Sequence, residues 1–233
     1  MAAAQLPLAL RYPPDQRFDT YVDADDHVLP QLRALARAHA GALPLDALYL
    51  SGPAATGKTH LLLAACADAE ACGRRAAYLP LTAATGMLRA ALESFEHADL
   101  LALDGLEAIV GDRDDQIALF DAHNRARDAG RNLLYAGRAM PDALDLDLPD
   151  LRSRLAQCVR IALAPLDDID RAEALRLRAQ RRGLHLDEAA IDWLLRRVDR
   201  DMPNLTALLD RLDRESLAAQ RRITVPFLRR VLG

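Results

Sequence analysis

The strongest chemical pattern in the chain is a glycine-rich loop that ends in lysine and threonine. Residues 52–59 form a complete Gly-x-x-x-x-Gly-Lys-Thr phosphate-binding motif. In such a loop the backbone N–H groups surround a phosphate chain, the lysine reaches the β- and γ-phosphates, and the threonine hydroxyl binds Mg²⁺. The residues predicted to bind ADP or ATP with Mg²⁺ are Gly52, Pro53, Ala54, Ala55, Thr56, Gly57, Lys58 and Thr59.

Lys58 is the single lysine among 30 lysine and arginine residues. Its compact ammonium group suits a point contact with phosphate that a planar guanidinium does not reproduce. The apolar run at 47–50 predicts a buried strand, and the helix-forming stretch from residue 60 follows the loop, which is the context the motif requires. The alternative is a glycine-rich turn that binds nothing.

A second candidate site residue is Asp104, which follows the apolar residues 100–103. This pattern is typical of a buried parallel strand that carries a carboxylate to the C-terminal edge of the sheet, where phosphates and Mg²⁺ would lie. Asp104 is therefore predicted to bind Mg²⁺ together with Thr59. A turn aspartate without a ligand is the alternative.

Segments typical of strands alternate with helical patterns up to Pro165, as a parallel sheet requires. We predict strands at 47–50, 76–81, 100–104, 133–135 and 159–163, with helices at 60–73, 86–97, 114–128 and 151–156. Beyond residue 165 the apolar spacing is helical only, at 169–182, 187–199, 204–220 and 225–232, and Trp193 is expected to anchor this part.

These patterns predict an α/β fold with a five-stranded parallel sheet flanked by helices, followed by a small all-α domain. The expected division is an extended peptide at 1–13, a nucleotide-binding domain at 14–165 and a helical domain at 166–233. A composition of 51% hydrophobic and 27% charged residues is typical of a globular protein. No apolar run approaches the length of a membrane span, and three cysteines without metal or disulfide spacing favour a cytoplasmic location.

The order of a phosphate-loop domain and a helical bundle resembles the AAA+ ATPases. Within them the chain is similar to the initiator clade, and in particular to DnaA-related regulators of the replication initiator DnaA. The resemblance rests on Phe-Asp-Thr-Tyr-Val at 18–22, Leu-Asp at 103–104, Leu-Arg-Ser-Arg-Leu at 151–155 and the segment 221–228. It implies that residues 166–233 form the lid domain of an AAA+ protein.

The N-terminal segment Gln-Leu-Pro-Leu-Ala-Leu at 5–10 is similar to the short peptides that dock onto the DNA sliding clamp. Pro7 favours an extended backbone, and apolar side chains next to a glutamine suit a pocketed surface. The residues predicted to bind the clamp are Gln5, Leu6, Leu8 and Leu10. A frayed apolar tail or an edge strand is the alternative.

The resemblance also implies weak intrinsic ATP hydrolysis. Family members usually place a second acid directly after the strand-end aspartate, whereas here Gly105 follows and Glu107 comes later. The polar residue at the end of the fourth strand is replaced by residues 136–138 (Ala-Gly-Arg), and the usual lid arginine by 202–204 (Met-Pro-Asn). Arg154, in contrast, falls where AAA+ proteins present an arginine finger to a neighbouring subunit, although a surface ion pair with Asp150 would also account for it.

The resulting expectation is a regulator that holds ADP or ATP, binds the sliding clamp, and stimulates hydrolysis of DnaA-bound ATP through Arg154, with homo-oligomers possible. The chain stops after the helical bundle, where DnaA-like initiators continue into a DNA-reading domain. Residues 1–165 carry 16 basic and 22 acidic side chains, so direct specific DNA binding is not expected. Two alternatives are an autonomous ATPase such as a helicase loader, and a binding module with a vestigial loop.

Overall fold

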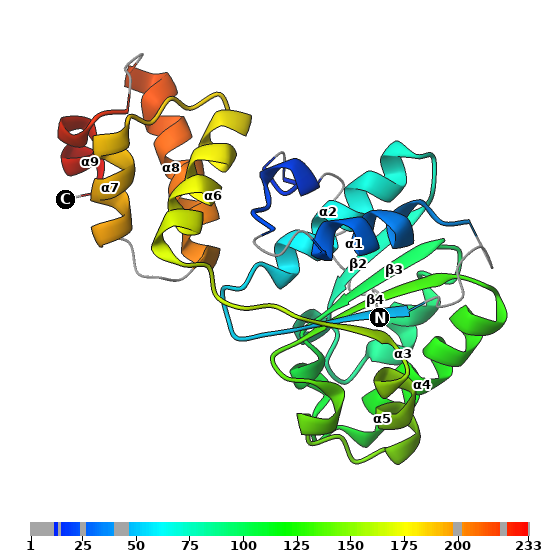
Figure 1. Ribbon diagram of the computed structural model, residues 1–233. Coiled ribbons are helices and arrows are strands. Elements are labelled where there is room, and N and C mark those ends of the chain that lie inside the picture. Colours follow the sequence, from blue (N-terminus) through cyan, green and yellow to red (C-terminus); the bar gives the residue numbers. More distant parts are fainter. Residues whose placement is uncertain are drawn as a thin grey trace, which may run out of the picture.

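The computed structural model describes residues 12–13, 15–23, 27–39, 47–197, 202–219 and 223–232. Its centre is a sheet of five parallel strands in the order β2-β3-β4-β1-β5 (Figure 1). The strands are β1 (Ala47–Ser51), β2 (Ala76–Pro80), β3 (Leu100–Asp104), β4 (Asn132–Gly137) and β5 (Val159–Ala162). This confirms the predicted α/β fold with its five-stranded parallel sheet.

The register of the strands brings three segments to one edge of the sheet. Ser51 at the end of β1 pairs with Gly137 at the end of β4, and Asp104 at the end of β3 pairs with Ala136. The pairing continues one step further, because the N–H groups of Gly52 and Gly105 donate to the carbonyls of Gly137 and Ala136. The loop after β1 and the acid at the end of β3 therefore lie on either side of β4.

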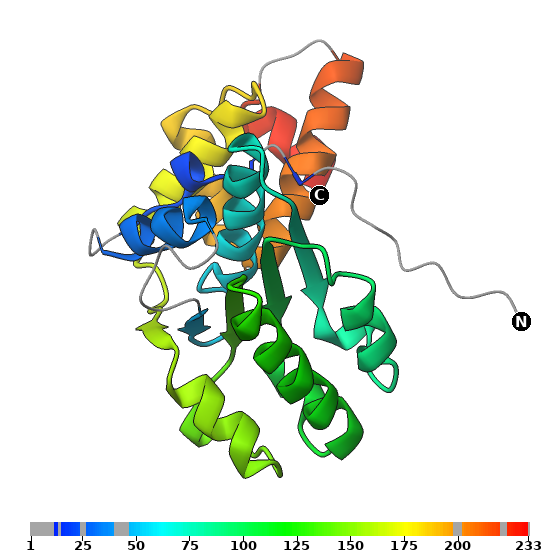
Figure 2. The same ribbon diagram turned by 90° about the vertical axis from the view of Figure 1, so that its right-hand side faces the viewer.

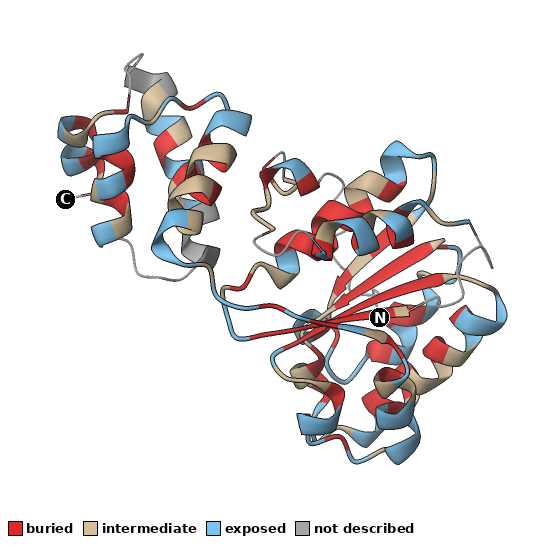
Figure 3. Ribbon diagram, viewed as in Figure 1, coloured by how far each residue is buried: buried red, intermediate tan, exposed pale blue. Residues whose placement is uncertain are grey.

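Alternate side chains of each central strand pack on opposite faces of the sheet, as the two-residue period of a strand requires. Leu101 and Leu103 face one core cluster, while Leu100 and Ala102 face the other. Buried residues run along the central strands β1, β3 and β4 (Figure 3), and the sequences of these strands are accordingly almost continuous apolar runs.

The helices of the α/β domain form one layer on each face of the sheet (Figure 1). The first layer holds the short 3₁₀ helix η1 (Phe18–Thr20), α1 (Val28–Arg37) and α2 (Lys58–Ala71). The second holds α3 (Leu88–Glu93), α4 (Arg113–Asp128) and α5 (Pro149–Ala156). Further 3₁₀ turns are η2 (Leu81–Ala83), η3 (Leu106–Ile109) and η4 (Pro141–Ala143).

Helix α3 is shorter than the helix predicted over 86–97, and tertiary contacts account for both ends. Gly86 has a left-handed φ of 74°, so the chain turns there rather than continuing a helix. The carboxylate of Asp115 in α4 accepts the N–H groups of Gly86 and Leu88 at 2.8 and 3.2 Å. At the other end the Ser94 hydroxyl donates to the Ala91 carbonyl at 2.6 Å.

The C-terminal part is a bundle of α6 (Asp168–Arg181), α7 (Glu188–Arg197), α8 (Met202–Ala219) and α9 (Val225–Leu232). Asp167 caps the N terminus of α6, because its side chain accepts the N–H of Asp170 at 2.8 Å. The core of the bundle is built from leucine, isoleucine and Phe227, and Trp193 packs only partly buried at its margin with Arg197 over its ring. Trp193 therefore contacts this core, as expected, but from its margin rather than from its centre.

The helical bundle lies beside the layer that holds α1 and α2, and η1 is positioned between that layer and α6 (Figures 1 and 2). The segment around η1 thus contacts both domains. Among the described residues, no helix combines the length and the apolar character needed to cross a membrane.

Candidate nucleotide-binding site

The phosphate-binding motif forms the turn between β1 and α2, as the sequence predicts. Gly57 precedes the first residue of α2 and has φ 85°, a left-handed conformation that side chains rarely adopt. A Cβ atom at Gly57 would lie 2.8 Å from Cε2 of Tyr21, so this position has no room for one. The N-terminal segment therefore presses directly against the loop, and only glycine fits between them.

The Lys58 ammonium group is held by the loop itself. Nζ donates to the carbonyl oxygens of Gly52 and Pro53, both at 2.6 Å. Burial lowers the pKa of Lys58, while the nearby carboxylates of Glu107 and Asp104 act in the opposite direction. The lysine is thus a cation placed beside two acids at the mouth of the loop.

Asp104 joins the end of β3 to the start of α2. Its Oδ2 accepts hydrogen bonds from the Thr59 hydroxyl at 2.6 Å and from the Tyr78 hydroxyl at 2.9 Å. Burial raises the pKa of Tyr78 far above its usual range, and Asp104 raises it further, so the phenol remains a hydrogen-bond donor. Tyr78 on β2 fixes the orientation of the carboxylate and was not predicted from the sequence.

The oxygen atoms of Thr59 and Asp104 converge as a Mg²⁺ site beside phosphates requires. Mg²⁺ in such sites takes one or two protein oxygens and completes its octahedral coordination with phosphate oxygens and water. In the described part of the chain no group of three or more His, Cys, Asp or Glu residues could hold a metal by itself. The donor set therefore fits Mg²⁺ that enters together with a phosphate chain.

Glu107 lines the same pocket as Asp104, although it lies three residues further along the chain. Gly105, with φ 82°, begins the η3 turn, which brings Glu107 to the same pocket. Glu107 Oε1 lies 3.0 Å from Nε of Arg138, and Oε2 accepts the backbone N–H of Arg138 at 3.1 Å. The segment after β4 thus contributes an arginine to the pocket, paired with a glutamate.

These groups surround a pocket of about 400 Å³, within the range of small-molecule sites. Its lining is Gln16, Ala54, Ala55, Gly57, Lys58, Thr59, His60, Asp104, Glu107, Arg138 and Arg178. Six of the predicted nucleotide-binding residues belong to this lining. Gly52, Pro53 and Thr56 do not, and they form hydrogen bonds within the loop.

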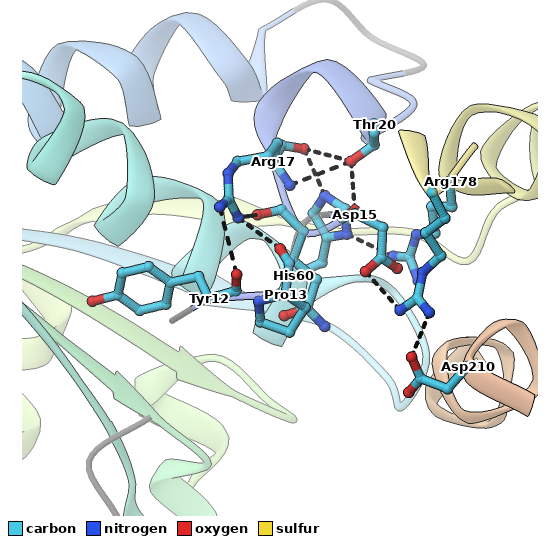
Figure 4. A network of polar contacts seen from close by, with 10 residues as sticks. Tyr12, Pro13, Asp15, Arg17, Thr20, His60, Arg178 and Asp210 are labelled. Carbon is cyan, nitrogen blue, oxygen red and sulfur yellow. Dashed lines mark hydrogen bonds and ion pairs between the residues drawn. The ribbon is translucent and has the colours of Figure 1, made fainter. Parts of the chain in front are cut away.

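His60, directly after the loop, links three parts of the protein (Figure 4). Its Nδ1 lies 2.6 Å from Nη2 of Arg178 in α6, and its Nε2 lies 2.8 Å from the carbonyl oxygen of Arg17. A guanidinium can only donate, so Nδ1 accepts and the proton of the neutral ring is on Nε2. Burial and the Arg178 charge lower the pKa of His60 to about 3, consistent with a neutral ring.

A buried ion pair joins the same parts beside His60 (Figure 4). Asp15 Oδ1 lies 2.8 Å from Nη2 of Arg182, and their side chains are 0% and 6% exposed. Arg182 also pairs with Asp210 on α8. The N-terminal segment, α6 and α8 are therefore held together by one charge network next to the pocket.

Arg154 lies on α5 and does not line this pocket. Its side chain is partly buried, makes no ion pair among the described residues, and lies near His123, whose pKa burial and then Arg154 lower to about 4. The neighbouring Arg152 is exposed. The predicted clamp-binding residues Gln5, Leu6, Leu8 and Leu10 lie outside the described residues.

Sequence reasoning missed His60, Arg138, Arg178 and Tyr78 as residues of the site. Arg178 carries no local signal, because it is one arginine among many on an amphipathic helix. Arg138 could have been found, because it follows β4 at the edge of the sheet where Asp104 lies.

The parallel sheet, the phosphate loop between β1 and α2, and the helical bundle together have the arrangement of the AAA+ fold. Residues 168–232 match the family model described as the lid domain of Hda. The chain resembles domain III of the replication initiation protein DnaA from Thermotoga maritima with a TM-score of 0.77 and 20% identity, covering 97% of this chain and 98% of that one. The chain thus has the fold of DnaA domain III, with a C-terminal part that is similar to the Hda lid.

Two further structures share the fold. A replication initiator DnaA bound to AMPPCP and single-stranded DNA matches 86% of this chain with a TM-score of 0.68 and 21% identity, and the chain spans 65% of that protein. The Thermotoga maritima RuvB Holliday junction branch migration motor matches 95% of this chain, with a TM-score of 0.66, 19% identity and 72% of its own length covered. At these identities the likeness concerns the fold.

Proposed function

We propose that the protein is a DnaA-related regulator that binds ADP or ATP with Mg²⁺, binds the DNA sliding clamp, and stimulates hydrolysis of ATP bound to DnaA. The observation that carries this proposal is the match of residues 168–232 to the Hda lid on a chain with the fold of DnaA domain III. The family resemblance stated from the sequence supplies the regulatory role. The pocket geometry supports nucleotide binding. The position of Arg154 supports an effect on ATP that is bound to another molecule.

Nucleotide binding rests on the convergence of groups at the pocket. The N terminus of α2 and the Lys58 cation suit phosphates, and Thr59 with Asp104 suits Mg²⁺. Bound Mg²⁺ neutralises charge on the phosphates and orients them. The function of Tyr78 is to hold the Asp104 carboxylate toward Thr59.

Weak intrinsic hydrolysis is supported by the arrangement around Glu107. A carboxylate that polarises a water molecule needs an accessible oxygen atom, yet Glu107 Oε1 forms an ion pair with Arg138 and Oε2 accepts the backbone N–H of Arg138. The nucleotide then serves chiefly to hold the two domains in their working arrangement. ADP is sufficient for that role.

The catalytic contribution is assigned to Arg154 acting on a partner. A guanidinium placed on a transferring phosphoryl group is worth about 10³ to 10⁵ in rate. Arg154 lies away from the chain's own pocket and has no acidic partner among the described residues, so its charge is available to a neighbouring molecule.

The test combines the purified protein, DNA-loaded sliding clamp and ATP-bound DnaA. Arg154→Ala is expected to lower the stimulated hydrolysis of DnaA-bound ATP at least 100-fold, whereas the matched control Arg152→Ala retains it. Equal stimulation by Arg154→Ala and by the parent protein would contradict the role of Arg154 as an arginine finger. Deletion of residues 1–10 is expected to abolish clamp binding. Unchanged binding would contradict the proposal that this segment binds the clamp.

The presence of Glu107 in the pocket favours a second candidate, an autonomous ATPase that acts as an assembly factor. This function predicts that the protein alone turns over ATP rapidly and assembles into a homo-oligomer while doing so. Hydrolysis by the isolated protein that Asp104→Ala abolishes would favour this candidate. Copurified ADP with negligible turnover favours the regulator.

A further inference from the structure

A second pocket lies against the C-terminal half of α2, apart from the candidate nucleotide-binding site. Its volume is about 310 Å³, and its lining comes from the segment around η1, from α1 and α2, and from α6 of the lid. Three arginines line it, Arg17, Arg33 and Arg181, together with the acids Asp19 and Asp68. None of its lining residues belongs to the nucleotide pocket, so a ligand here occupies a separate site.

Two of these arginines have no carboxylate partner among the described residues. The guanidinium of Arg17 donates to three backbone carbonyl groups between residues 12 and 16, at 2.7, 2.9 and 3.5 Å (Figure 4). Arg33 lies over the ring of Phe18, with its Cζ atom 5.3 Å from the ring centroid. Both cations are therefore held at the pocket by uncharged groups, which leave their charge available to an anion.

The two aspartates do not offset these charges. Asp68 accepts two hydrogen bonds from Arg37, at 2.7 and 2.9 Å, so its charge is already paired. Asp19 lies 3.6 Å from Arg181 in a pair that is about half exposed, and water weakens such a pair. With Arg37 included, four arginines and two aspartates give this region a charge of +2, although the whole chain carries −4.

The wall that α2 contributes leaves room for a ligand between the arginines. Its side chains at Ala64, Ala67 and Ala71 are small, and their spacing of three and four residues places them on one face of the helix. A guanidinium presents its N–H donors in a planar fork that matches the oxygen atoms of phosphate. The pocket therefore combines open space with donors of the right geometry for a phosphate group.

We propose that this second pocket binds the phosphate group of a small phosphate monoester, with Arg17, Arg33 and Arg181 as donors. A phosphate monoester carries a charge of about −1.5 to −2 near pH 7, which matches the lining better than the single charge of a carboxylate. The ligand replaces Asp19 as the partner of Arg181, and it joins η1 and α1 to α6. Because the site is separate from the phosphate loop, the inference does not depend on nucleotide binding.

The test titrates the full-length protein with glycerol 3-phosphate by calorimetry, at constant ionic strength and with excess ADP and Mg²⁺ to occupy the phosphate loop. Arg33→Gln is expected to weaken this binding about 10- to 100-fold, the range for a charge-assisted hydrogen bond. Arg181→Gln tests the contribution of the lid and is expected to act in the same direction. The matched control is Arg89→Gln, an exposed arginine of α3 that pairs with Asp121 outside the pocket and should not alter binding.

Four results would overturn the inference. The phosphate site is refuted if the parent does not bind glycerol 3-phosphate, or if Arg33→Gln binds it equally well. Equal losses in Arg33→Gln and Arg89→Gln would show an effect of net charge alone. Acetate that binds as tightly as glycerol 3-phosphate, and depends equally on Arg33, would assign the pocket to carboxylates. A thymidylate decamer that binds more tightly, with the same dependence on Arg33, would assign it to the phosphodiester backbone of a nucleic acid.

Discussion

Arg138 contacts both carboxylate oxygens of Glu107. Its Nε lies 3.0 Å from Oε1, and its backbone N–H donates to Oε2 at 3.1 Å. The two side chains are 71% and 30% exposed, and an ion pair this accessible to water is worth at most about 1 kcal/mol. Arg138 therefore restrains Glu107 without immobilising it.

Removing this restraint should raise intrinsic ATP hydrolysis. About 1 kcal/mol corresponds to a factor of about 5, so Arg138→Ala is expected to increase turnover by the isolated protein up to about 5-fold. The increase should disappear in the Glu107→Gln background, because no carboxylate remains to be released. Single-turnover hydrolysis of the two single variants and the double variant measures this coupling. A fall in both backgrounds would show that Arg138 assists the nucleotide directly.

Tyr78 should determine how well the site holds Mg²⁺. Its hydroxyl orients Asp104, and loss of a hydrogen bond that orients a metal ligand typically costs 10- to 100-fold in metal affinity. We expect Tyr78→Phe to raise the Mg²⁺ concentration needed for tight ADP binding about 10-fold. The matched control is Tyr12→Phe, whose hydroxyl donates to Glu70 on the exposed side of α2. A Mg²⁺ requirement equal to that of the parent would contradict the orienting role.

The sequence was sufficient for the sheet, the loop and Asp104, because each depends on local patterns. Continuous apolar runs predict buried parallel strands, and the glycine-lysine-threonine spacing predicts the turn between β1 and α2. The length of α3 was not predictable in this way, since its start depends on Asp115 in α4. The same applies to Trp193, because burial in the lid depends on which helix faces meet.

The residues on the lid side of the site could not be predicted from the sequence, for a related reason. His60 meets Arg178, and Asp15 meets Arg182, only when the N-terminal segment, α2 and the end of α6 pack together. No spacing along the chain connects residues more than 100 positions apart. Contacts of this kind are set by tertiary structure, and a single sequence contains no periodic signal for them.

The ion pair between Asp15 and Arg182 should stabilise the arrangement of the two domains. Both side chains are buried, and removing one partner of a buried pair leaves an uncompensated charge that costs about 3 to 5 kcal/mol. Because Arg182 keeps Asp210, we expect Asp15→Ala to lower the free energy of unfolding by about 3 kcal/mol, the lower end of that range. Denaturant unfolding measures this change.

The exposed pair between Asp19 and Arg181 is the matched comparison. These residues come from the same two segments, but their side chains are 57% and 49% exposed and the closest atoms are 3.6 Å apart. Asp19→Ala should therefore cost less than about 1 kcal/mol. Equal losses in the two aspartate variants would show that burial does not govern the strength of the pair.

Two buried histidines should make the protein less stable in mild acid. Burial lowers the pKa of His60 to about 3 and that of His123 to about 4, whereas the unfolded chain protonates histidine near pH 6.5. Between these values the unfolded state binds protons that the folded state does not, so the free energy of unfolding falls as the pH falls. At pH 5 each histidine accounts for about 2 kcal/mol of that loss.

His123 offers the cleaner test, because its Nδ1 contacts the Tyr135 hydroxyl at 2.9 Å and glutamine can keep a hydrogen bond there. Urea unfolding of the parent and of His123→Gln is measured at pH 7 and pH 5. The loss on acidification should be about 2 kcal/mol smaller in the variant, because the carboxylates titrate alike in both proteins. An identical loss in both would mean that His123 protonates in the folded protein as readily as in the unfolded chain.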